Sequence, residues 1–138
     1  MIERQKNRAI EIHHSVLDTL LLDCGDAVLH FSHLYIHETE NVPGIDAGTG
    51  WSQAGKLTIS GGIIEGSFSE LPRDLWDGCI NMDETVSENM IPIPLDYKGK
   101  IELQLEAWNQ VREIISISGK GARLELIGEA EYVEEFKP

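Results

Sequence analysis

Strict alternation of apolar and polar residues is the feature that most constrains this chain. Its clearest instance is the segment 100–108, whose apolar side chains are Ile101, Leu103, Leu105 and Ala107. Successive side chains of a β-strand point to opposite faces, so this pattern predicts a strand with one buried and one solvated face.

The same alternation recurs along the chain, interrupted by turn residues. Segments 111–118 and 122–127 follow 100–108, and short connections at 109–110 and 119–121 predict a three-stranded meander. Segments 16–22 and 28–36 predict a hairpin around Gly25, which can supply the positive φ of a tight turn. Segments 57–60 and 63–68 predict another hairpin around Gly61-Gly62.

The remaining segments are shorter. We expect strands at 80–82 and 90–91, the latter confined to a sheet edge or its exit by Pro92 and Pro94. Segment 72–78 is irregular, with room for one helical turn. Segment 15–22 also fits a helix with Ser15 as its N-cap, but so short a helix is marginal, and we favour a strand. The sequence therefore predicts an all-β fold, an antiparallel β-sandwich or small barrel of about eight or nine short strands with meander hairpins and at most one short helix.

Length and composition indicate one ordinary globular domain. The 138 residues have the size of a single domain, so we expect one β domain over residues 1–138. Cys24 and Cys79 lie in separate segments, which favours reduced thiols over a disulfide framework. No signal-peptide core follows the N-terminus, and no apolar stretch approaches the roughly 20 residues of a membrane span. We expect a soluble, cytoplasmic protein.

The charge balance narrows the class of partner. Asp and Glu number 24 against 11 Lys and Arg, a formal net charge of −13. Binding to nucleic acid or to an anionic membrane depends on Lys and Arg, so we expect neither as a partner. A basic protein surface matches this field, although acidity also serves solubility alone. A homodimer formed through exposed strand edges is a further expectation.

The histidines form the first candidate site. All five lie between positions 13 and 37, and three of them, His30, His33 and His37, interrupt one apolar run. On a strand His33 and His37 share a face but lie about 13 Å apart, too far to bind one ion, and His30 lies on the opposite face. The expected arrangement is a polar face whose side chains are hydrogen-bonded to neighbours, and we assign no metal site.

The connection from Glu38 to Gly50 forms the second candidate. It contains three glycines but no lysine of the phosphate-loop type, and no helix follows it. So long a connection is either a binding loop or an ordered crossover between sheets in which Trp51 closes the edge of the core. The candidate ligand-binding residues are His33, His37, Asp46 and Trp51.

No arrangement in the sequence supports catalysis. Ser15 beside His14, and Ser32 beside His33, are sequence neighbours, and neighbours on a strand point to opposite faces. The chain has no Gly-x-Ser-x-Gly segment. We assign no catalytic residue and no cofactor.

The C-terminal segment 128–138 is a candidate docking surface. Four glutamates there are interleaved with Tyr132, Val133 and Phe136. Apolar anchors in a negative field suit a basic partner. The alternative is a last strand that packs its aromatic residues on the sheet.

The segment Ile10-Glu-Ile-His-His-Ser-Val-Leu17, followed by a hairpin that ends in Leu29-His-Phe31, resembles the start of many small bacterial β-proteins. Those proteins commonly carry Phe-His-Asp-Ser and an Asp-Gly turn. Here His14 stands in place of the Asp, and Cys24-Gly25 in place of the turn. Some of them resemble immunity proteins, so the resemblance implies a small bacterial β-domain and toxin neutralisation as one function. It assigns no functional residue.

These observations together predict a small acidic, non-catalytic binding or interaction module. One alternative is an immunity-type inhibitor of a basic toxin or nuclease. The other is a small-ligand or metal-dependent enzyme that uses the 33–51 region.

Overall fold

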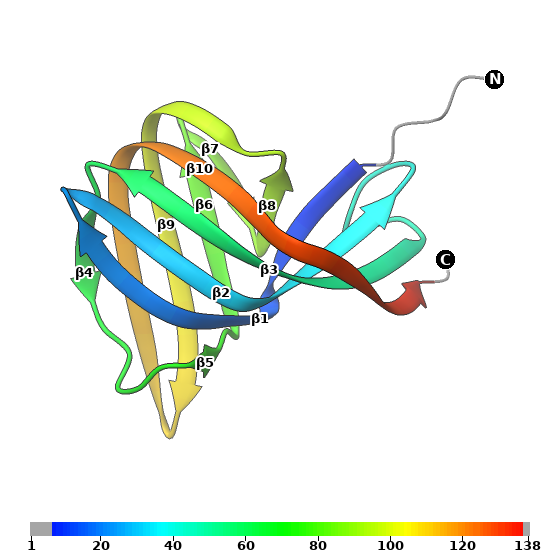
Figure 1. Cartoon of the computed structure of the whole chain (residues 1–138), viewed down its shortest axis with the longest axis horizontal. Coiled ribbons are helices and arrows are strands. Elements are labelled where there is room, and N and C mark those ends of the chain that lie inside the picture. The colour runs from blue at the N-terminus through cyan, green and yellow to red at the C-terminus, as the bar shows by residue number, and fades with distance from the viewer. Residues whose placement is uncertain (1–6, 137–138) are drawn as a thin grey trace.

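The computed structural model describes residues 7–136, which form a single antiparallel sheet curled into a half-barrel (Figure 1). Its ten strands follow the order β5-β1-β2-β3-β10-β9-β6-β7, with β4 paired to β10 and β8 paired to β1. The strands are β1 (Asn7–Asp23), β2 (Asp26–Thr39), β3 (Gly48–Ser60), β4 (Ile63–Gly66), β5 (Arg73–Asp74), β6 (Asp77–Met82), β7 (Thr85–Glu88), β8 (Met90–Ile93), β9 (Asp96–Asn109) and β10 (Val111–Phe136). The predicted all-β, antiparallel class is confirmed. Among the described residues no helix has the length and apolarity that crossing a bilayer requires.

The alternating segment 100–108 lies in β9 and buries one face, as predicted. All four of its apolar side chains are at most 1 % exposed and line the concave side of β9, where they join the apolar residues of β1, β2 and β3. The apolar void between Ile10, Leu57 and Leu105 measures only about 10 Å³, which is close to the smallest volume that holds one water. The core is filled rather than hollow.

The first predicted hairpin is confirmed. β1 and β2 pair from Asn7–Thr39 to Asp23–Asp26, and both residues of the connecting turn have positive φ, 52° at Cys24 and 85° at Gly25. This is the two-residue turn whose twist matches that of the flanking strands. Segment 15–22 lies within β1, so the helical alternative is wrong.

The predicted turn at Gly119-Lys120-Gly121 is wrong. β10 continues through it without reversing, pairs with β9 on one side, and reaches Phe136 as a strand of 26 residues. A Cβ on Gly119 would lie 2.5 Å from a methyl carbon of Ile59 and 2.6 Å from the Ser60 carbonyl oxygen. Glycine is present here because neighbouring strands approach closely, not because the chain turns.

The predicted hairpin at Gly61-Gly62 is also wrong. β3 and β4 do not pair with each other; both pair with β10, β3 through Gly121–Phe136 and β4 through Ile115–Ser118. Their partners are successive stretches of one strand, so β4 continues the line of β3 after a break at the two glycines.

Segment 72–78, predicted to be irregular, connects β1 with β9. β5 replaces the helical turn allowed for 72–78 and pairs with β1. The next two residues connect β1 with β9, because Leu75 N donates to Ser15 O (2.9 Å) and Trp76 N donates to Glu106 O (2.8 Å). The predicted short strands correspond to β6 and β8, and β8 pairs with β1 alone among the described strands.

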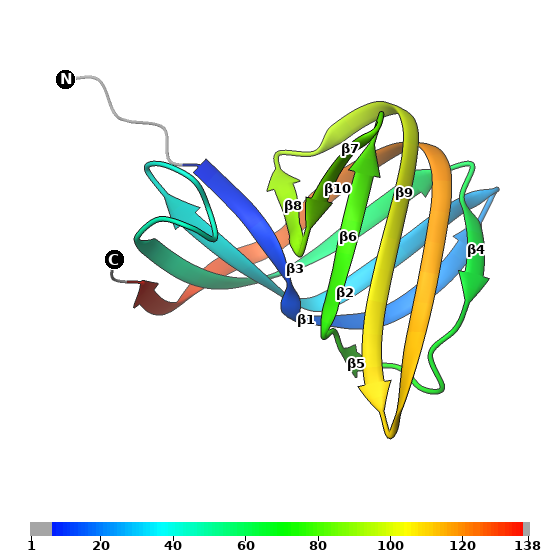
Figure 2. The same cartoon turned by 180° about the vertical axis from the view of Figure 1, so that it is seen from behind.

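Parts of β1, β2, β3 and β10 extend beyond the half-barrel as an arm (Figure 2). We define the arm as residues 7–12 of β1, 34–39 of β2, 48–53 of β3 and 131–136 of β10, and the rest as the body. Register shifts mark the boundary in each pairing, between Glu11 and Val16, between Phe31 and Leu34, and between Ile127 and Glu131. These shifts lie opposite one another across the sheet, and aligned bulges are the local kinks that bend strands.

Candidate functional site

The aligned bulges change which histidines share a face. Leu29 and Phe31 belong to the core before the bulge in β2, whereas Leu34 and Ile36 belong to it afterwards. The extra residue reverses the alternation, so His30 lies on the same side of the sheet as His33 and His37. The prediction that His30 lies on the opposite face is wrong. The sequence of residues 27–37 does not predict this bulge, because apolar residues occupy both odd-numbered and even-numbered positions there.

Four histidines and three other rings meet on the outer face of the sheet, on both sides of the boundary between the arm and the body. Tyr35 contacts His33 (6.3 Å between ring centroids), His37 (5.3 Å) and His14 (5.9 Å). His37 stacks on Phe136 at 4.5 Å, His13 stacks on His14 at 3.9 Å, and Trp76 stacks on His13 at 5.7 Å. We call the continuous series the ring row; its members in order are Phe136, His37, Tyr35, His14, His13 and Trp76. It is buried at His37 and Tyr35 and exposed at Trp76.

Carboxylates border the buried half of the ring row. The Tyr35 hydroxyl donates to the Glu134 carboxylate, and His37 Nε2 lies 3.4 Å from a carboxylate oxygen of Glu11. Burial, reinforced by the hydrogen bond to Glu134 and the charges of Glu134 and Glu11, raises the pKa of Tyr35. Gly50 makes the cluster possible, because a Cβ there would lie 2.5 Å from the Tyr35 hydroxyl oxygen.

His33 lies beside this row and is hydrogen-bonded through Nδ1 to the Ser52 hydroxyl. Burial lowers the pKa of His33, the charge of Asp74 opposes the shift, and the charge of His14 reinforces it. The predicted polar face with hydrogen-bonded neighbours is therefore present at His33.

The other two candidate residues lie elsewhere. Trp51 is paired with Ile36 across the strands, on the face opposite His37, and packs against the core. Asp46 belongs to the β2–β3 loop and accepts from Val42 N within that loop (2.8 Å). The four predicted site residues thus do not converge on one concavity.

The loop itself is shorter than expected and does not cross between sheets. β2 extends to Thr39 and β3 begins at Gly48, so only residues 40–47 connect two adjacent antiparallel strands. Hydrogen bonds from Thr39 Oγ1 to Ala47 O (2.6 Å) and from Asp46 N to Val42 O (3.0 Å) make it a compact hairpin loop.

The residues considered for nucleophilic chemistry have structural roles. Ser15 is fully buried in the β1 bulge, where its hydroxyl donates to Glu11 O (2.7 Å) and accepts from Tyr35 N (3.1 Å). Burial, reinforced by Glu102, Glu88 and Asp77, raises the pKa of Cys79 and keeps its thiol protonated. Within residues 7–136, no group of three or more His, Cys, Asp and Glu side chains is arranged to hold a metal ion.

Two surfaces that combine exposure with chemistry lie outside the four predicted ligand-binding residues, and the second overlaps the C-terminal segment 128–138 that the sequence marks as a candidate docking surface. One is a cleft of about 290 Å³ beside β5, whose lining includes Trp76 and Trp108, 55 % and 50 % exposed. Trp108 could have been identified from sequence, because it follows Ala107 in the alternating strand and so belongs to the solvated face. Trp76 could not, because segment 72–78 has no periodicity.

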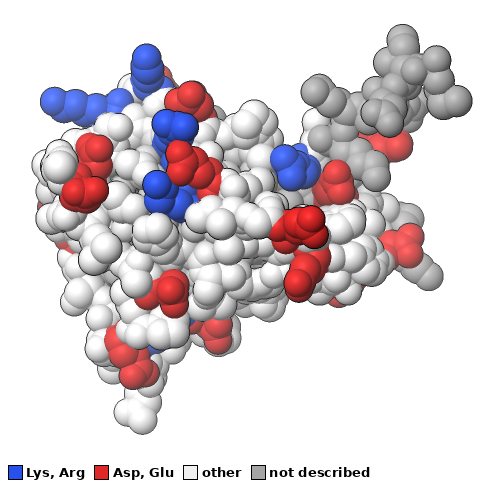
Figure 3. All heavy atoms as spheres, in the orientation of Figure 1, with Lys and Arg blue, Asp and Glu red and all other residues white. Residues whose placement is uncertain are grey.

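The second surface is the outer edge of β10 along the arm. β3 pairs with one side of β10 as far as Phe136, but β9 ends its pairing at Arg123. Within the described part of the chain, no strand pairs with the other side of residues 125–136. These residues include five glutamates and no Lys or Arg. The face seen in Figure 3 shows mainly Asp and Glu on the arm, while Lys and Arg gather at one end of the body.

Comparison of the chain with protein-family models, with curated protein sequences and with solved structures finds no match in any of the three. The resemblance to small bacterial β-proteins therefore stays a prediction, and the surfaces described above are the basis for a functional proposal.

Proposed function

We propose that this protein is a non-catalytic binding module that captures a basic, extended segment of a partner protein along the free edge of β10. The observation that carries the proposal is an open strand edge, residues 125–136, that contains five glutamates and no Lys or Arg. Unpaired backbone N–H and C=O groups on an edge are a template for an added strand.

Side chains beside this edge supply anchors. Tyr132 is 57 % exposed and contacts Trp51 at 5.6 Å between ring centroids, and Ile127 and Val133 are also exposed. An added strand would cover these groups while its backbone pairs with β10. Aromatic anchors within a polar surround are typical of protein interfaces.

The charge of the edge decides between a basic segment and a second copy of the chain. Antiparallel pairing of two β10 edges would place glutamates of both copies along one ladder, and like charges opposite one another are destabilising. Lys or Arg in the added strand would instead form cross-strand pairs. The homodimer expected from sequence is therefore less favourable at this edge than capture of a basic segment.

Inhibition of a basic toxin or nuclease is the narrower form of this function. The acidic arm favours it, since complementary charge speeds encounter between such partners. We place the module in the cytoplasm as part of the same proposal, in keeping with its two free thiols, Cys24 and Cys79.

The architecture that supports the module is, we infer, a small barrel rather than a sandwich. The hydrogen bonds of Leu75 and Trp76 link β1 to β9, and those of Asn89 link β1 to β6 (Asn89 N to Gly78 O and Ile12 N to Asn89 O, both 2.8 Å). These links support closure of the curl at the base of the arm, which would hold the arm at a fixed angle to the body.

The test uses a capped peptide of alternating Lys and Thr, about six residues long, the usual length of a strand. A peptide with Glu in place of Lys is its matched control. We expect the basic peptide alone to bind in calorimetry, and its affinity to fall with added salt. The Glu129→Lys/Glu131→Lys variant should bind it about fivefold or more weakly, because two attractive cross-strand contacts become repulsive.

The matched control variant is Asp18→Lys/Glu65→Lys, which changes the net charge equally at exposed positions of β1 and β4. It should retain most of the affinity. Equal losses in both variants, or no binding of the basic peptide, would overturn the proposal.

A further inference from the structure

The cleft beside β5 has the size and composition of a side-chain pocket. Its volume of about 290 Å³ is at the lower limit of small-molecule sites, so it suits one side chain rather than a larger ligand. It is lined by Val16, Glu70, Pro72, Arg73, Asp74, Trp76 and Trp108.

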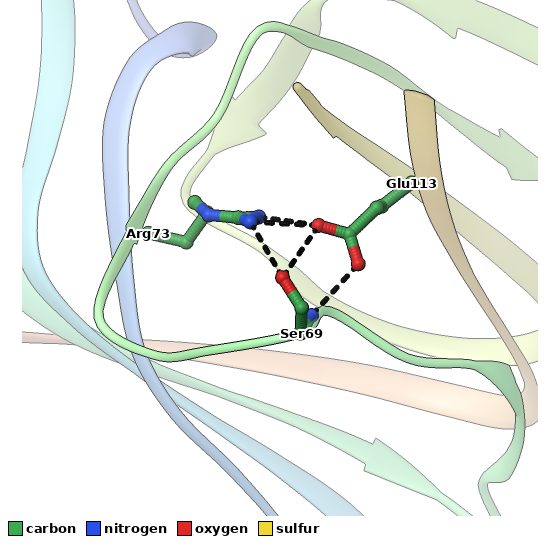
Figure 4. Close-up of polar contacts among 3 residues, drawn as sticks. All are labelled: Ser69, Arg73 and Glu113. Carbon is green, nitrogen blue, oxygen red and sulfur yellow. Dashed lines mark hydrogen bonds and ion pairs between the residues drawn. The ribbon is translucent and has the colours of Figure 1, made fainter. Parts of the chain in front are cut away.

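The single cation of the lining is already neutralised. Both terminal nitrogens of Arg73 donate to Glu113 Oε1 at 2.7 Å, and Nη2 also donates to Ser69 Oγ at 3.0 Å (Figure 4). Ser69 donates to the same carboxylate through its hydroxyl (3.0 Å) and its backbone N–H (2.8 Å). The side chains of Arg73 and Glu113 are only 9 % and 14 % exposed.

The two carboxylates of the lining are exposed and not neutralised. Among residues 7–136, neither Glu70 nor Asp74 forms a salt bridge, and the Arg73 guanidinium is engaged with Glu113. The cleft therefore combines two negative charges with two aromatic side chains and has no free positive charge of its own.

The tryptophans are positioned by different elements. Trp76 is fixed by its backbone hydrogen bond to Glu106 and by stacking on His13 at the exposed end of the ring row. Trp108 belongs to the solvated face of β9, two residues beyond Glu106. Indole faces attract cations, and tryptophan binds them best among aromatic side chains.

We propose that this cleft binds an arginine side chain of a protein partner, between Trp76 and Trp108 and against Glu70 and Asp74. Arginine fits better than lysine, because its planar guanidinium both stacks on an aromatic face and forms paired hydrogen bonds with a carboxylate. The site stands on observations separate from the β10 edge.

Nuclear magnetic resonance can test the site with N-acetyl-arginine amide, and with N-acetyl-citrulline amide as the uncharged control of nearly the same shape. The indole N–H signals of Trp76 and Trp108 should shift on titration with the arginine probe. The signal of Trp51, whose Nε1 donates to Thr49 Oγ1 at 2.8 Å, should stay unchanged. Each signal can be assigned from a Trp→Phe variant.

Two variants separate the aromatic and acidic contributions. Trp108→Ala and Asp74→Asn should each weaken arginine binding about threefold or more, whereas Val111→Ala, an exposed residue near the same hairpin, should not. Retention of dispersed amide signals shows that each variant is folded. Because Asp74→Asn keeps both rings, it remains informative if Trp108→Ala unfolds.

Equal shifts with citrulline, shifts centred on Trp51, unchanged affinity in both variants, or no shifts at all would overturn the proposal. The Glu129→Lys/Glu131→Lys protein should bind the arginine probe normally. Failure of the strand-capture function would thus be distinguishable from failure of this site.

Discussion

The ion pair between Arg73 and Glu113 shows how one residue pair can secure a segment that has little regular structure. The pair attaches the connection between β4 and β5 to β10 (Figure 4). Phe68 adds a second contact, with the Arg73 guanidinium carbon 5.8 Å from its ring centroid. This attachment also positions β5, and hence Trp76.

We predict that Glu113→Ala destabilises the protein by about 3–5 kcal/mol, because it leaves a largely buried guanidinium without its partner. Urea unfolding measures the change. Glu125→Ala, which removes the exposed pairs with Lys56 (3.1 Å) and Arg123 (3.2 Å), is the control and should cost at most about 1 kcal/mol. Similar losses in the two variants would show that the Arg73 pair is not the anchor.

The lowered pKa of His33 makes the free energy of unfolding depend on pH. Burial lowers its pKa in the folded state below the ordinary value of 6.5, so the unfolded chain binds the proton more readily. As the pH falls through 6.5, protonation therefore favours the unfolded chain until the folded-state pKa is passed. The His33→Asn variant should lose less unfolding free energy than the parent protein between neutral and mildly acidic pH. A variant whose stability falls just as steeply would assign the pH dependence to other groups.

At the scale of elements, β10 joins the body to the arm. It pairs with β9, β4 and β3, and Gly119 allows the close approach of β3. Gly119→Ala should therefore destabilise the protein by about 1–3 kcal/mol through overpacking against Ile59 and Ser60. Lys120→Ala, an exposed position beside it, should change stability little. A tolerated Gly119→Ala, measured by thermal unfolding, would indicate that β10 does not have this packing.

The same strand shows what the sequence could and could not predict. Alternation was enough for β9 and the first hairpin, because burial of one face is encoded in every second residue. It failed at Gly119 and Gly61, since glycine serves both turns and close approaches and a single chain does not tell which. It also could not predict the bulge between Phe31 and Leu34, which places His30, His33 and His37 on one face. The sequence therefore singled out the histidines as candidates, but it could not predict their packing against Phe136 and Trp76, which come from distant segments.

At the scale of the whole molecule, the bend between the arm and the body separates the two proposed binding surfaces. The filled core spans the body and the base of the arm, because Ile10 and Leu34 belong to it. The Trp76–Trp108 cleft lies in the body. The arm extends away from the body (Figure 1) and includes most of the acidic edge of β10. The ring row connects the two, since it runs from Phe136 at the end of β10 to Trp76 beside β5. Both proposed surfaces select positive charge, in agreement with the net charge of −13.

Backbone hydrogen exchange of residues 125–136, with and without the alternating Lys–Thr peptide, tests strand capture most directly. Amides on the free edge of β10 should exchange more slowly when the peptide is bound, because their N–H groups gain carbonyl partners, while amides of β7 should not change. Binding of the peptide without added protection at 125–136 would contradict capture at this edge.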